Sequence, residues 1–102
     1  MKVYLNKVEY NICGRKTWDY EICTHDKKHK NRAKYVTIEK RDDTWMCWFC
    51  FNEGKPNVMC KSLDGILDVA RNTVSNFTLI KTGKFVNPDD IEIVGLNEIV
   101  EK

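Results

Sequence analysis

The sequence predicts an α+β fold: a single domain, residues 1–102, in which an antiparallel sheet of five to six strands carries one helix (about 62–76) packed on one face. Apolar and polar residues alternate with a period of two through most of the first half, which is typical of strands. One later segment repeats its apolar residues at spacings of three and four, the period of a helix. A length of 102 residues allows one domain of ordinary size.

The first two strands are predicted to form a hairpin. Even-numbered residues from 4 to 12 are mostly apolar, and a second run at 17–22 alternates again, with aromatic side chains on one face. Gly14 lies between the two runs and tolerates the positive φ of a tight turn.

The next two strands follow after a polar insertion. Residues 35–40 resume the alternation, residues 41–43 form a turn, and residues 44–51 are apolar on both faces. A strand of the last kind is expected near the centre of a sheet, covered on both sides. We expect a loop at 52–57 and a short strand at 58–61.

The helix is predicted at 62–76. Ser62 fits its N-cap, and Asp64 lies in the first turn, where the helix dipole favours negative charge. The apolar stripe consists of Leu63, Ile66, Leu67, Ala70, Val74 and Phe77. Beyond it we expect two short strands within 78–86, separated by a glycine turn, and a closing strand at 91–94.

The polar insertion, residues 24–33, is a candidate functional loop because it is longer than a tight hairpin requires. Its cations cannot neutralise one another, so they are either solvated or facing an anion. We predict a partner- or phosphate-binding site made of Lys27, Lys28, Lys30, Arg32, Lys34, Trp18, Tyr20 and Tyr35. The aromatic residues would offer stacking surfaces. The alternatives are a solvated loop and aromatic residues that belong to the sheet core.

The chain has five cysteines, an odd number that cannot pair completely within one chain and that favours a reduced setting. The residues that could together hold one tetrahedral zinc ion are Cys23, His25, His29, Cys47 and Cys50. In a regular strand Cys47 and Cys50 point to opposite faces. We therefore expect no metal and no cofactor, with a structural zinc as the alternative.

The chain carries none of the common sequence motifs of catalysis. The chain has no Gly-x-Ser-x-Gly elbow, no phosphate loop and no dinucleotide-binding glycine motif. Asp19, Glu21 and Glu39 share the solvent-facing parity of their strands and could converge, but a solvated sheet face explains them more simply. We expect that the protein is not an enzyme.

The distribution of charge suggests a role near nucleic acid. Residues 1–41 carry 11 Lys or Arg against 5 acids, whereas residues 42–102 carry 6 against 10. We expect a small cytoplasmic binding protein, a virus- or mobile-element-type modulator or inhibitor of a nucleic-acid-processing or host-defence protein, in an anti-CRISPR-like role. The alternative is a direct nucleic-acid-binding domain.

We expect a protein partner, for example a nucleic-acid-binding complex. Direct binding of nucleic acid is the alternative. Eleven aromatic residues are more than one helix and one sheet can hide, so exposed aromatic side chains could also support a homodimer. We expect no membrane partner, because the longest charge-free runs have nine residues and a membrane helix needs about 20.

Overall fold

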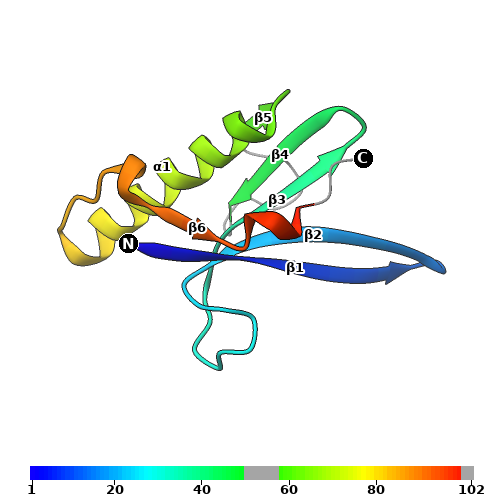
Figure 1. Cartoon of the computed structure of the whole chain (residues 1–102), viewed down its shortest axis with the longest axis horizontal. Coiled ribbons are helices and arrows are strands. Elements are labelled where there is room, and N and C mark those ends of the chain that lie inside the picture. The colour runs from blue at the N-terminus through cyan, green and yellow to red at the C-terminus, as the bar shows by residue number, and fades with distance from the viewer. Residues whose placement is uncertain (50–57, 100–102) are drawn as a thin grey trace.

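The computed structural model describes residues 1–49 and 58–99 (Figure 1). Its elements in chain order are β1 (Lys2–Ile12), β2 (Arg15–Cys23), β3 (Lys34–Arg41), β4 (Thr44–Phe49), β5 (Val58–Cys60), α1 (Leu63–Thr82), the 3-10 turn η1 (Pro88–Asp90), β6 (Glu92–Val94) and the 3-10 turn η2 (Leu96–Glu98). Within this described part, one helix packs against a curled six-stranded sheet of order β5-β4-β3-β2-β1-β6. The predicted α+β class is confirmed.

The hairpin of β1 and β2 turns at Cys13 and Gly14, whose φ angles of 52° and 80° match the two-residue turn that suits the right-handed twist of strands. β2 pairs with β3 only between Tyr20 and Cys23. The distal half of the hairpin, residues 8–19, therefore extends beyond the sheet as a two-stranded ribbon, which we call the hairpin arm (Figure 1).

The core lies between α1 and one face of the sheet. Its fully buried members come from four strands and the helix, and they include Val3, Ile22, Ile38, Cys47, Ile66 and Val74. In β4 the neighbours Trp45 and Met46 point to opposite faces and are both buried, as predicted for a strand covered on both sides. The last two residues of that predicted strand, 50 and 51, lie outside the described residues.

Helix α1 begins as predicted and continues six residues further, to Thr82. The Oγ of Ser62 accepts a hydrogen bond from Gly65 N at 3.1 Å, which forms the N-cap. Gly83, with a φ of 73°, donates its N–H to the carbonyl of Leu79 and ends the helix. The strands predicted within 78–86 are therefore wrong: residues 78–82 are helical and residues 84–87 have no regular structure.

The closing strand is confirmed with its start one residue later, and its direction corrects the antiparallel prediction. β6 pairs in parallel with the beginning of β1, because Ile91 and Ile93 enter the core beside that strand. The sheet is thus mixed, although mostly antiparallel. Gly95, with a φ of 97°, turns the chain away, and a Cβ there would lie 2.9 Å from the carbonyl oxygen of Leu5. No helix in the described ranges is long and apolar enough to span a membrane.

Candidate functional site

The basic loop, residues 24–33, projects from the sheet between β2 and β3 (Figure 1). Two hydrogen bonds close its base: Thr24 N donates to Ala33 O at 2.8 Å, and Ala33 N donates to Thr24 Oγ1 at 3.0 Å. Asn6, which is 3% exposed, donates from Nδ2 to the carbonyl of His25 at 3.1 Å. The loop is therefore attached to β1 as well as to its own strands.

The interior of the basic loop is also hydrogen-bonded. Asp26 accepts from His29 N at its carbonyl (2.9 Å) and from Lys28 N at its carboxylate (3.1 Å). Arg32 donates from Nη1 to the carbonyl of Lys27 at 3.0 Å. The rings of His25 and His29 stack with their centroids 4.0 Å apart. These contacts give the exposed segment a defined shape.

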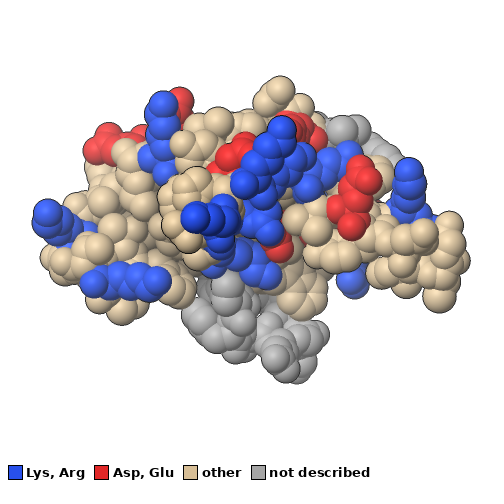
Figure 2. Space-filling model, turned by 90° about the horizontal axis from the view of Figure 1, so that it is seen from below, with Lys and Arg blue, Asp and Glu red and all other residues tan. Residues whose placement is uncertain are grey.

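The cations at the tip of the loop remain available. Among the residues that the structure describes, no side-chain ion pair is formed by Lys27, Lys28, Lys30 or Arg32. Lys34, at the start of β3, differs because its Nζ lies 3.8 Å from a carboxylate oxygen of Glu21. Figure 2 looks onto this end of the molecule and shows Lys and Arg side chains gathered near the middle of the face.

The three predicted stacking residues are already engaged within the protein. Tyr20 is 2% exposed, so it belongs to the core, the alternative that the sequence left open. Half-buried Trp18 donates from Nε1 to the Tyr20 hydroxyl at 3.1 Å, and Lys7 Nζ lies 4.6 Å from its ring centroid. Tyr35 makes a T-shaped ring contact with Phe77 on α1, with the centroids 6.2 Å apart. The cations thus form the more accessible part of the predicted site.

The potential zinc ligands that the structure describes do not assemble. Within residues 1–49 and 58–99 there is no group of three or more side chains placed to hold a metal ion. Cys23 and Cys47 are buried, and burial raises the pKa of both thiols, that of Cys47 to about 12. A raised pKa disfavours the thiolate that binds metals. The Nδ1 atoms of His25 and His29 bond Thr24 Oγ1 and Asn31 N, while Cys50 lies outside the described residues.

The three acids that share one strand parity do converge on the sheet face opposite α1. Burial, then a hydrogen bond and charge repulsion from Glu39, raises the pKa of Asp19 from 3.8 to about 7. Arg41 forms an ion pair with Glu39, as Lys34 does with Glu21. Asp19 can therefore hold a proton near neutral pH beside Glu39. Their parity was readable from the sequence, but their proximity depends on the pairing of β2 with β3.

Comparison of the chain with protein-family models, with curated proteins and with solved structures finds no match.

Proposed function

We propose that this protein is a non-enzymatic binding protein of nucleic-acid machinery whose basic loop contacts the phosphate backbone. One observation carries the proposal: Lys27, Lys28, Lys30 and Arg32 lie on an exposed, internally hydrogen-bonded loop and form no ion pair within the described residues. Holding four like charges on ten residues is unfavourable unless an anion or solvent screens them. A nucleic acid supplies regularly spaced phosphates for such a group.

The loop favours contact with the backbone over reading of bases. Base recognition needs side chains that reach base edges, or aromatic rings on which bases stack. The aromatic residues nearest the loop pack against the protein itself. Affinity should accordingly depend weakly on sequence and strongly on salt.

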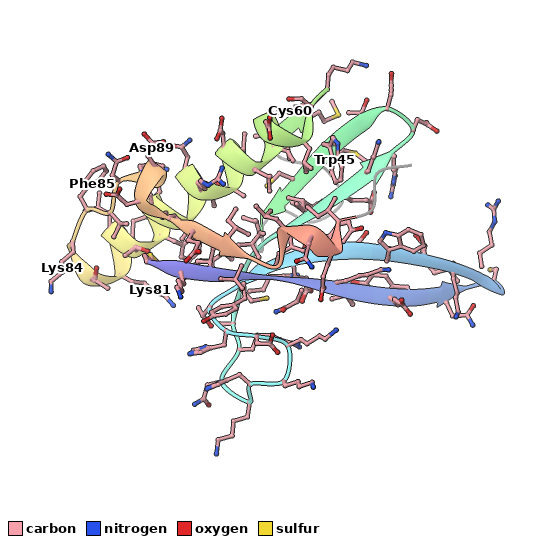
Figure 3. All side chains as sticks on the ribbon, in the orientation of Figure 1. Trp45, Cys60, Lys81, Lys84, Phe85 and Asp89 are labelled. Carbon is pink, nitrogen blue, oxygen red and sulfur yellow. The ribbon has the colours of Figure 1, made fainter. Side chains whose placement is uncertain are left out.

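A second candidate function, a modulator of a nucleic-acid-processing or host-defence protein, is favoured by exposed apolar side chains away from the loop. Ile80 and Phe85, near the end of α1, are 82% and 68% exposed. Lys81 and Lys84 lie at the same end of the molecule as Phe85 (Figure 3). A protein's nucleic-acid site is usually basic and would repel the loop. Such a modulator would therefore bind its target through these apolar side chains.

Fluorescence anisotropy with a labelled duplex tests the first proposal. The variant K27Q/K28Q/K30Q removes three cations and keeps Arg32, whose guanidinium bonds the loop backbone. Four phosphate contacts predict a log-log salt slope of about -3.6, or roughly a hundredfold loss of affinity between about 50 and 200 mM salt. The variant should reduce the slope to about -0.9.

The matched control is K16Q/K61Q/K84Q, which removes the same charge from exposed sites outside the loop. It should leave the slope near the wild-type value. Equal effects of the two triple variants would show attraction by net charge alone and would contradict a loop-specific site. No binding of duplex or single strand at low salt would leave the protein-directed function as the better proposal.

A further inference from the structure

The outer edge of β1 is paired over only part of its length. β6 covers Lys2 to Tyr4 in the parallel ladder, and Gly95 then turns the chain away beside the Leu5 carbonyl. From Lys7 to the end of β1, the described residues pair with this strand on one side only, through β2. Within residues 1–49 and 58–99, the backbone of the hairpin arm is therefore open along one edge.

The two-residue turn determines which backbone groups face that edge. The residues that flank such a turn, Ile12 and Arg15, form a hydrogen-bonded pair, so even-numbered residues of β1 direct their N–H and C=O groups toward β2. Odd-numbered residues direct theirs outward, and accordingly Met1 O accepts from Glu92 N at 2.9 Å on the β6 side. The outward-facing residues of the open segment are Lys7, Glu9 and Asn11.

This edge has few of the features that usually keep edge strands apart. β1 is 11 residues long, has no proline, and keeps one continuous register with β2. Its two open-edge charges, Lys7 and Glu9, lie 3.8 Å apart and compensate each other. Tyr10 and Ile12 are 40% and 60% exposed on one face. A long, open and partly apolar edge of this kind is a template for another strand.

There is room beside the edge for a second strand. An open groove of about 640 Å³ borders Lys7 and Glu9, with Lys27, Asn97 and Glu98 as its other lining residues. A strand that approaches the arm can place its end there without meeting β6, which stops at Val94. The mixed charges of the groove repel neither sign strongly.

Two copies of this edge could pair in several two-fold registers. An antiparallel pair of identical strands has a two-fold axis, and directly opposite residues project from the same face. An axis at Val8 would place Lys7 opposite Glu9 but would extend the pairing to Leu5, where Gly95 already lies against the backbone. An axis at Glu9 would place two carboxylates opposite each other, which is unfavourable. An axis at Tyr10 places Val8 opposite Ile12 on one face and Glu9 opposite Asn11 on the other. The Tyr10 register also uses the part of the edge farthest from β6.

We propose that the protein forms a two-fold dimer in which the open β1 edges of two copies pair antiparallel about Tyr10. Glu9 of each copy exchanges backbone hydrogen bonds with Asn11 of the second copy, because both residues direct their N–H and C=O groups outward. The exposed Tyr10 and Ile12 side chains then become cross-strand neighbours. The inference is independent of the basic loop and of any nucleic acid.

Light scattering coupled to size exclusion tests the dimer on the full chain. The wild type should show twice the 12.0 kDa mass of one chain. Asn11→Pro removes an outward N–H and leaves the pairing of β1 with β2 intact, since proline is tolerated where an edge strand faces solvent. This variant should be monomeric, whereas the control Asn11→Ala should remain dimeric.

A monomeric wild type at high concentration would overturn the proposal, as would a dimer that Asn11→Pro leaves intact. If the protein is monomeric and its β1 edge binds an extended segment of another protein, the dimer is refuted and the edge is a binding site for that segment. Far-ultraviolet circular dichroism checks that Asn11→Pro folds like Asn11→Ala.

Oxidative cross-linking tests the register without proline. In a background carrying Cys13→Ser, which removes the exposed thiol of the turn, Tyr10→Cys should form a disulfide-linked dimer. Glu9→Cys in the same background should cross-link poorly, and the background alone should not cross-link. Efficient cross-linking through Glu9→Cys alone would overturn the Tyr10 register, and cross-linking through neither residue would overturn the dimer.

Discussion

Asp19 shows how one carboxyl can make stability depend on pH. Its pKa rises from 3.8 to about 7 on folding. Burial disfavours the charged carboxylate, and Glu39 then hydrogen-bonds the protonated carboxyl and repels the charged one. Between these two values the folded protein holds a proton that the unfolded chain has released. Stability is therefore greatest below about pH 4 with respect to this group, and falls as the pH rises to 7.

Asp19→Asn should remove this pH dependence. A full shift of about three units corresponds to about 4 kcal/mol, and solvent screening at this half-buried site reduces the expected gain at neutral pH to about 1 to 2 kcal/mol. Urea unfolding between about pH 4 and 8 measures it. The control Asp43→Asn alters an exposed ion pair with Lys61 and should change little. Parallel pH profiles for the wild type and Asp19→Asn would refute the raised pKa of Asp19.

At the scale of elements, Asn6 connects β1 to the basic loop, a link that period-two alternation does not reveal. Asn6→Ala leaves the His25 carbonyl without its partner in a buried setting, so the free energy of unfolding should fall by about 1 to 3 kcal/mol. Asn11→Ala, on the exposed part of the same strand, should change it by under about 0.5 kcal/mol. Amide exchange at Thr24 and Ala33 should accelerate only in Asn6→Ala. Equal effects of the two substitutions would contradict this role.

The elements that the sequence predicted well depend on local rules. The hairpin turn at Gly14 and the Ser62 cap are decided by residues within one or two turns of the chain. The end of α1 was missed because its threonines and Ile80 resemble a strand. In the structure, Thr78 and Thr82 instead donate from Oγ1 to carbonyls four residues earlier, which suits a helix.

The long-range pairing of strands could not be predicted from the sequence for a different reason. Alternation identifies strands and their faces but not their neighbours, so the parallel contact of β6 with β1 could not be read from it. The same limit applies to the site: the cations of the basic loop were visible as composition, whereas the burial of Tyr20 and the meeting of Asp19 with Glu39 follow from which strands lie side by side.

For the whole molecule, the open β1 edge links folding to association. In the monomer, the hairpin arm contributes little to the free energy of folding, because isolated two-stranded ribbons are marginally stable. In a dimer each arm becomes part of a four-stranded sheet. Dimerisation of the folded state alone also raises the unfolding temperature as protein concentration rises.

The thermal midpoint of the wild type should therefore increase with concentration, by a few degrees per hundredfold for a domain of this size, while that of Asn11→Pro stays constant. Calorimetry at low and high protein concentration measures both. The outward-facing amides of the arm, those of Glu9 and Asn11, should exchange more slowly in the concentrated wild type, because only pairing across the open edge protects them. A constant midpoint in a wild type already shown to be dimeric would mean that the dimer dissociates before it unfolds or that the unfolded chains associate too. Unprotected arm amides would place the interface elsewhere.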